Sequence, residues 1–189
     1  SPAAGKQLSK DGADTLKRMF LELGGNDALL IFEDADLDKA LDEMVNSRME
    51  NNGQVCCSSK RFLVHRSIYD TVASRLVQRL EALPRGMARD ENAMVTSLVS
   101  EKAAVDVESQ IAHTVDQGAR VLYGGKREGA RIEPTVLVNV NRDMDIASNM
   151  EVFGPVFPLI PFDSVEEAVE IANNSIYGLS SGLMTKDMN

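Results

Sequence analysis

Strand-length apolar runs alternate along this chain with segments whose apolar residues repeat at helical spacing. Residues 28–33 (Ala-Leu-Leu-Ile-Phe-Glu) form one run, and residues 61–65 (Arg-Phe-Leu-Val-His) form the next. Between the runs, apolar residues recur on one helix face, at Leu37, Ala40, Leu41, Met44 and Val45. This alternation predicts an α/β fold, with an open, mostly parallel sheet covered by helices on both faces.

Turn and capping residues set the limits of the other expected elements. The first helix has caps in Asp34 and Asp36 and should fade near residues 51–53 (Asn-Asn-Gly). Further helices are expected before Pro84, between Ser100 and Gly118, and after the capping box of residues 164–167. Further strands are expected at residues 120–123, 132–140 and 179–184, with Pro134 at a sheet edge or a strand start.

Length, charge and hydropathy indicate a single domain and argue against nucleic-acid and membrane partners. The 189 residues, 43% apolar and 26% charged, suit one compact domain. The net charge of -9 argues against nucleic acid as a partner, because phosphate binding needs a basic face. No run approaches the roughly 20 apolar residues that span a bilayer, and residues 1–6 lack the apolar core of a signal peptide. We therefore expect no membrane partner and a cytoplasmic location.

The chain has two cysteines, Cys56 and Cys57, which are adjacent and follow a glycine turn at Gly53. They lie between a predicted helix and a predicted strand, in the kind of loop that often carries chemistry. Adjacent cysteines cannot join distant segments, which favours a reducing compartment. A free thiol is only about 3% thiolate at pH 7, so a nucleophile needs local donors or dipoles. From these residues alone, a nucleophile with its neighbour packed inward, a buried inert cysteine and a redox pair all remain possible.

Glu22 stands in an apolar, strand-like run between Leu21 and Leu23 that closes on Gly24. A carboxylate with apolar neighbours is a stronger base than one in water, which suits a general base near neutral pH. The alternative is an outward-facing strand residue that alternates with the two leucines.

Other polar residues give weaker indications. The Asp34-Asp36-Asp38 series has Lys39 and Val45 where a calcium loop needs glycine and glutamate, so we expect no metal site. His65 and His113 have no second histidine at ligand spacing and no acidic partner in the local sequence. Both histidines are interpreted as structural.

Three motifs together resemble the aldehyde dehydrogenase superfamily. They are the glutamate motif at residues 21–25, the cysteine motif at residues 53–56 and a third motif at residues 151–156 (Glu-Val-Phe-Gly-Pro-Val). They occur in the family's order and near its spacing, and the likeness extends over essentially the whole chain. Within the family, residues 25–27 and 57–62 look most like the succinate-semialdehyde dehydrogenase branch.

The resemblance implies a catalytic role for two side chains. Cys56 would attack the aldehyde carbon, and its backbone N–H would bind the oxyanion that forms. After hydride transfer to NAD or NADP, Glu22 would activate the water that releases the acid from a thioester. The substrate would be a small aldehyde, and the parent enzyme would be a homo-oligomer.

The resemblance also implies a set of cofactor-binding residues. Glu151 would hold the nicotinamide ribose and Phe153 would border the nicotinamide. Leu23 and Gly24 are expected to complete the set.

The family pattern further implies that the chain is a piece of a longer enzyme. Residues 1–22 resemble the tail end of the dinucleotide-binding domain, and residues 23–189 resemble the catalytic domain without its C-terminal part. We therefore do not expect this piece alone to bind the cofactor or oxidise aldehydes. Glu50 stands where the family often has an aromatic residue, and Thr96 and Ser97 replace a Gly-Pro word. A folded interaction module without catalysis and a thiol-redox module are the alternative functions.

Overall fold

A six-stranded, mostly parallel sheet forms the centre of the molecule in a computed structural model that describes residues 2–187. Its strand order is β3-β6-β7-β2-β1-β8, and only β3 runs antiparallel to its neighbour. The strands are β1 Asp27–Ile31, β2 Ser59–His65, β3 Arg120–Tyr123, β6 Thr135–Val138, β7 Val156–Phe162 and β8 Ser181–Met184. A separate two-stranded ribbon consists of β4 Arg127–Glu128 and β5 Arg131–Ile132.

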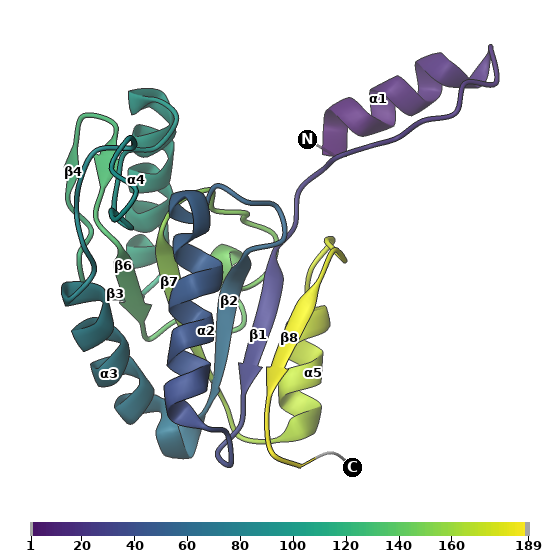
Figure 1. Ribbon diagram of the computed structural model, residues 1–189. Helices are drawn as coiled ribbons and strands as arrows, with labels where there is room; N and C mark the ends of the chain where they lie inside the picture. The colour runs from purple at the N-terminus through teal and green to yellow at the C-terminus, as the bar shows by residue number, and fades with distance from the viewer. Residues whose placement is uncertain (1, 188–189) are drawn as a thin grey trace.

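Helices cover both faces of this sheet, which confirms the predicted fold class (Figure 1). The covering helices are α2 Leu37–Met49, α3 Tyr69–Glu81, α4 Glu101–Asp116 and α5 Val165–Asn173, while α1 Pro2–Ala13 lies apart from the sheet. Because side chains of a strand alternate between faces, Leu29 and Ile31 of β1 pack with α2 and α3. Ala28 and Leu30 join the cluster that contains α4 and α5.

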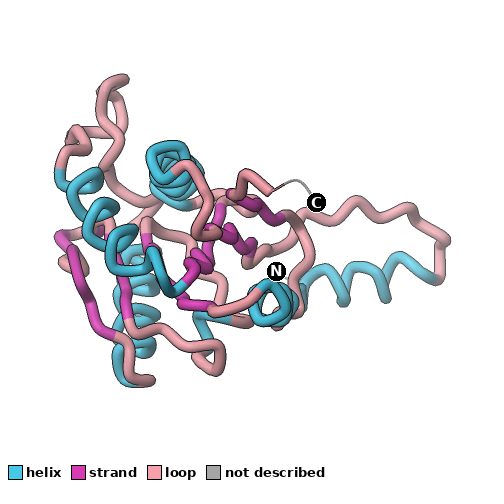
Figure 2. The backbone as a smooth tube through the Cα atoms, turned by 90° about the horizontal axis from the view of Figure 1, so that it is seen from below, coloured by secondary structure: helices cyan, strands magenta, loops and turns pink. Residues whose placement is uncertain are grey.

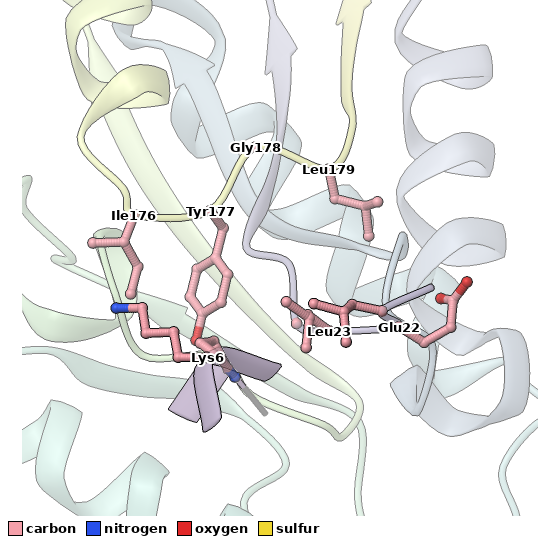
Figure 3. Close-up of a pocket in the computed structure, with 10 residues that line it drawn as sticks. Lys6, Glu22, Leu23, Ile176, Tyr177, Gly178 and Leu179 are labelled. Carbon is pink, nitrogen blue, oxygen red and sulfur yellow. The ribbon is translucent and has the colours of Figure 1, made fainter. Parts of the chain in front are cut away.

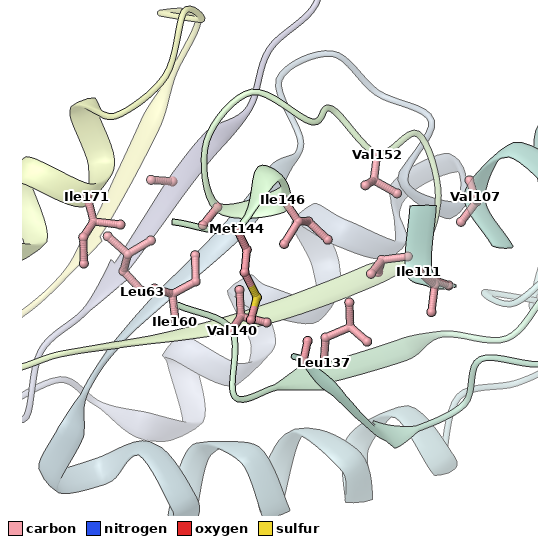
Figure 4. Packing of buried hydrophobic residues seen from close by; sticks show 14 of the residues in the cluster. Leu63, Val107, Ile111, Leu137, Val140, Met144, Ile146, Val152, Ile160 and Ile171 are labelled. Atoms are coloured by element: carbon pink, nitrogen blue, oxygen red, sulfur yellow. The ribbon is translucent and has the colours of Figure 1, made fainter. Parts of the chain in front are cut away.

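The second of these clusters fills the face of the sheet that α4 and α5 cover. Figure 4 shows part of it, with Leu63 and Ile160 of the sheet next to Ile171 of α5, and with Val107 and Ile111 of α4 at its other end. The labelled side chains are almost fully buried. Together the two cores hold the sheet rigidly under the loops that carry the three motifs.

Capping residues begin the helices as predicted. Asp36 accepts from the Lys39 N–H at the start of α2, and Ser100 accepts from the Ala103 N–H at the start of α4. Ser164 does the same for α5. The run at residues 132–140 is not one strand, because Pro134 separates β5 from β6.

Strand β7 was not predicted, although it lies between β6 and β2 in the sheet. It contains Pro158 and Pro161, which lack the N–H that a central strand normally donates. Its first half pairs only with β6, over Val156 to Pro158, and its second half pairs only with β2, over Leu159 to Phe162. Each half therefore has a side without a partner strand, so the strand tolerates two prolines that lack an N–H.

Residues 2–26 form an arm that leaves the sheet. Helix α1 and the following extended segment lie side by side and reach away from the body of the molecule (Figures 1 and 2). The expected strand-like run around Glu22 is wrong, because residues 17–26 have no strand partner. Ser1, Met188 and Asn189, at the limits of the two expected domains, lie outside the described residues. Across residues 2–187, no helix has the length and apolar character to cross a membrane.

Candidate active site

A left-handed turn positions the cysteine loop. After α2 ends at Met49, Asn51 and Asn52 have φ of 46° and 54°, and Gly53 has φ of 76°. Asparagine and glycine tolerate this conformation better than other residues. A Cβ on Gly53 would lie 2.4 Å from the carbonyl oxygen of Gly154, so the cysteine loop and the third motif touch backbone to backbone.

Neither cysteine of the loop is fully buried. Cys56 is half-buried and Cys57 is exposed, so the expectation that Cys57 packs inward is wrong. Ser58 takes the inward direction instead: it is buried, and its hydroxyl accepts from the Arg48 guanidinium at 3.1 Å. A polar side chain therefore anchors this turn.

Glu151 of the third motif lies beside the glycine pair of the first. Its Oε1 accepts from the Gly25 N–H at 2.8 Å. A Cβ on Gly24 would lie 2.2 Å from Glu151 Oε2, and one on Gly25 would lie 2.7 Å from the Cys56 carbonyl oxygen. The three motifs that are distant in sequence thus meet at one place.

Lys60, which was not predicted from the sequence, lies at the centre of this meeting point. Its side chain is 1% exposed, and its Nζ is 3.7 Å from Glu151 Oε1 and 5.5 Å from the centre of the Phe153 ring. Burial lowers the pKa of Lys60, as does the nearby Arg48, while Glu151 is the main group that raises it. The only signal in the sequence was a lysine at an inward position of a buried strand directly after the cysteine loop.

Two buried arginines hold the surrounding backbone. Arg48 of α2 donates to the carbonyls of Val152 and Val156, and Arg61 of β2 donates to that of Asn26. Burial lowers the pKa of Arg48 to about 9 and that of Arg61 to about 10, and a nearby carboxylate opposes the shift in each case. Both guanidiniums also donate to further backbone carbonyls, which fixes the loops of the site to the sheet.

Glu22 does not have the surroundings that the sequence suggested. It is exposed, as are its neighbours Leu21 and Leu23, because the segment lies outside the sheet. It lines a pocket of ≈ 460 Å³ together with Leu23, Gly24 and residues 176–179. Figure 3 shows its carboxylate directed away from Lys6 and Tyr177. Cys56 does not line this pocket.

The residues at which this chain differs from the family pattern line a second pocket, of ≈ 360 Å³. Glu50 lines it from the end of α2, and Thr96 and Ser97 line it from the facing loop. The Asn52 amide also lines it, donating to the Thr96 hydroxyl at 2.6 Å and accepting from the Thr96 N–H at 3.0 Å.

The remaining candidates have structural partners. His113 lies 2.7 Å from Asp145, where this hydrogen bond lowers the pKa of the carboxylate, and His65 lies 3.7 Å from Glu33. Both acidic partners were missed because they are distant in sequence. The described residues contain no group of three or more histidine, cysteine, aspartate or glutamate side chains that could hold a metal ion.

Comparison with known proteins identifies the class to which this site belongs. The model of the aldehyde dehydrogenase family matches residues 1–189. The chain therefore belongs to the aldehyde dehydrogenase family, as the three motifs predicted.

Relatives that are named for different substrates are similar to this chain. Lactaldehyde dehydrogenase of Escherichia coli (strain K12) is 37% identical, and mitochondrial succinate-semialdehyde dehydrogenase of Oryza sativa subsp. japonica is 38% identical. Both alignments cover 100% of this chain, but only 40% and 36% of the two relatives. The crystal structure of succinate-semialdehyde dehydrogenase from Burkholderia pseudomallei matches with a TM-score of 0.95 and 41% identity, covering 100% of this chain and 39% of that one. The chain thus spans about 40% of the length of the curated relatives it matches.

Proposed function

We propose that the protein containing this chain oxidises a small aldehyde to a carboxylic acid, with Cys56 as covalent nucleophile and NAD or NADP as hydride acceptor. The observation that carries the proposal is the meeting of the three motifs, in which Gly25 binds the Glu151 carboxylate and contacts the Cys56 carbonyl. Family membership supports the reaction type.

The groups of the chain would act in two stages. The Cys56 thiolate adds to the aldehyde carbon, and the Cys56 N–H binds the resulting oxyanion. Departure of hydride leaves a thioester on Cys56. Glu22 then takes a proton from a water molecule, which attacks the thioester and releases the acid and the Cys56 thiolate. One aldehyde and one water thus give one acid, one hydride and one proton.

The residues expected to bind the cofactor suit a nicotinamide nucleotide. Glu151 Oε2 has no hydrogen-bond donor within residues 2–187, so it can accept from a ribose hydroxyl. Phe153 is 41% exposed beside it and offers an aromatic face to a flat ring. Leu23 and Gly24 would approach the cofactor from the arm. When bound, the nicotinamide supplies the hydride acceptor. Similar structures include betaine aldehyde dehydrogenase from Staphylococcus aureus with NAD+ and the enzyme GapN from Methanocaldococcus jannaschii with NADP.

The domain division remains part of the proposal. We assign residues 1–22 to the tail of a dinucleotide-binding domain and residues 23–189 to the catalytic domain, which the departure of the arm from the sheet supports. Cofactor binding and activity are assigned to the whole protein, and this chain alone is expected to be inactive. A homo-oligomeric parent and a cytoplasmic location stay predictions.

Glu50 bears on the choice of aldehyde. If its pocket receives the substrate, the carboxylate repels anionic aldehydes and favours neutral or cationic ones. Relatives named for lactaldehyde, glutarate semialdehyde and 3-sulfolactaldehyde have comparable identities, from 37% to 39%. These identities favour no one aldehyde, whereas the Glu50 carboxylate in this pocket favours a neutral or cationic one.

Substitution of each cysteine in the full-length protein tests the function. We expect Cys56→Ser to abolish aldehyde-dependent reduction of NAD or NADP, because a hydroxyl is a far weaker nucleophile. Cys57→Ser is the matched control and should retain most of the activity. Equal loss in both variants, together with a stable Cys56–Cys57 disulfide, would favour the redox module. Full activity in Cys56→Ser would refute covalent catalysis by this thiol.

A further inference from the structure

The ammonium of Lys60 gathers the backbone of the cysteine loop. Its Nζ donates to the carbonyl oxygens of Cys56 at 2.6 Å, Val55 at 3.0 Å and Ser58 at 3.3 Å. An ammonium has three N–H donors, so these carbonyls use all of them. One buried side chain therefore sets the direction of three peptide groups in the loop.

These contacts also set the direction of two amide N–H groups. In a trans peptide the carbonyl and the following N–H point to opposite sides, and no cis peptide bond occurs among the described residues. Because the Val55 carbonyl points at Lys60, the Cys56 N–H points away from it. Because the Cys56 carbonyl also points at Lys60, the Cys57 N–H likewise points away from Lys60. Neither N–H has an acceptor within residues 2–187, so both are available to a ligand.

Further contacts hold the ammonium itself. Glu151 Oε1 lies 3.7 Å from Nζ, and the Phe153 ring centre lies 5.5 Å from it. The side chain leaves from the start of β2, where Ser59 and Arg61 pair with β1 on either side of it and pairing with β7 begins at Phe62. Burial of the side chain and its contacts with Glu151 and Phe153 therefore hold Lys60 in place, and the loop is oriented against it.

We propose that Lys60 is a positioning residue of the reaction, which aims the Cys56 N–H at the oxygen of the thiol adduct by holding the Val55 and Cys56 carbonyls. The inference rests on the proposed function, in which that N–H stabilises the oxyanion. Without Lys60, the Val55–Cys56 peptide can rotate and turn a carbonyl oxygen toward the developing negative charge. Loss of one oxyanion donor lowers kcat by about 100- to 1,000-fold in other enzymes.

Two reactions of the same thiol separate this role from others. Alkylation by iodoacetamide displaces iodide at a saturated carbon, so it needs the Cys56 thiolate but no oxyanion donor. Aldehyde oxidation needs both. In the full-length protein, we expect Lys60→Met to lower kcat for aldehyde oxidation by at least about 10-fold, with the alkylation rate of Cys56 changed by less than about 3-fold.

A control at another lysine and a second substitution at Lys60 complete the experiment. Lys102→Met removes an exposed lysine that pairs only with Asp106 within the described residues, and it should change neither rate. If Lys60→Met does not fold, as judged by thermal unfolding, Lys60→Gln gives the same comparison with two uncharged N–H donors.

Three results would overturn the inference or its basis. An unchanged kcat in the Lys60 variants, with Cys56→Ser inactive, would refute the positioning role and leave the proposed function intact. A parallel loss of alkylation and oxidation would refute it too, because Lys60 would then act on the thiolate. Activity in Cys56→Ser would refute the proposed function itself.

Discussion

At Gly24 the absence of a side chain leaves the space that the Glu151 carboxylate occupies. A Cβ there would also lie 3.0 Å from Tyr177 Cε1, so the neighbours on two sides leave no room for it. Glu151 cannot move aside freely, because its other oxygen is held by the Gly25 N–H. The position of this carboxylate therefore depends on a glycine that touches it.

Gly24→Ala should displace Glu151 and weaken cofactor binding. We expect the KM for NAD or NADP to rise by about 10-fold, the effect of losing one hydrogen bond to a charged group. The measurement is steady-state kinetics of the full-length enzyme. Gly178→Ala is the matched control in the same pocket, since a Cβ there would meet nothing within 4 Å. Equal KM values in the two variants would contradict the role given to Gly24.

Single residues of the site were only partly predictable. Cys56 and Glu151 were proposed from the sequence because their motifs are short and local. Lys60 was missed because its three carbonyl partners are defined only by the folded loop. Glu22 was given apolar surroundings from its neighbours in sequence, but those leucines are exposed because no strand forms there.

At the scale of elements, strand β7 depends on side chains to complete its hydrogen bonding. Its two halves pair with different strands, so each half has one side without a strand partner. The Val156 carbonyl accepts from Arg48 Nε at 2.9 Å, and the Leu159 carbonyl accepts from the Tyr69 hydroxyl at 3.0 Å. Helices α2 and α3 thus supply donors that a neighbouring strand would otherwise give.

Tyr69→Phe should destabilise the protein by about 1–3 kcal/mol, because the buried Leu159 carbonyl loses its donor. Denaturant unfolding of the full-length protein measures the change. Tyr123→Phe is the control, since its hydroxyl accepts only from the exposed Arg85 within the described residues. A loss no greater than that of the control would show that the Tyr69 bond is dispensable.

The same tyrosine gives a pH dependence. Burial raises the pKa of Tyr69 from 10.0 to about 12. Between these values the unfolded chain has lost the phenol proton while the folded chain retains it, so the free energy of unfolding falls as pH rises from 10 to 12. Tyr69→Phe should show a smaller fall over this interval, and an identical pH dependence in the variant would contradict the assignment.

Most other elements were predictable because their signals are local. Helices α2, α4 and α5 have apolar spacing and capping residues that act within a few positions of the chain. Strand β7 was missed because Pro158 and Pro161 argue against a central strand, and only the tertiary arrangement shows that each half has one partner. Helix α1 was missed because it lacks an apolar stripe facing the core.

Across the whole molecule, the arm of residues 2–26 differs from the body in what it buries. Only Gly5 and Gly12 of α1 are buried, and they face Leu21, Leu23 and Met19 of the returning segment. The arm therefore packs mainly against itself. Several large apolar side chains on it are exposed, including Leu16 and Phe20.

Hydrogen exchange of the 189-residue chain should reveal this difference. Helices with little buried apolar contact open at low free-energy cost, so we expect α1 amides to exchange at least about 100-fold faster than those of β2 and β7. Mass spectrometry of peptic fragments measures the rates. Helix α5 is the control, because it is similarly short but packs on the sheet. Equal protection of α1 and α5 would contradict the self-contained arm.

The contact of Gly53 with Gly154 has a consequence for how this sequence can diverge. A methyl group on Gly53 would collide with main-chain atoms, which no second-site substitution can remove. A methyl group on Gly154 would collide with the Val107 side chain, which a smaller residue could relieve. Evolution can therefore compensate a change at one of these glycines but has no such route at the other.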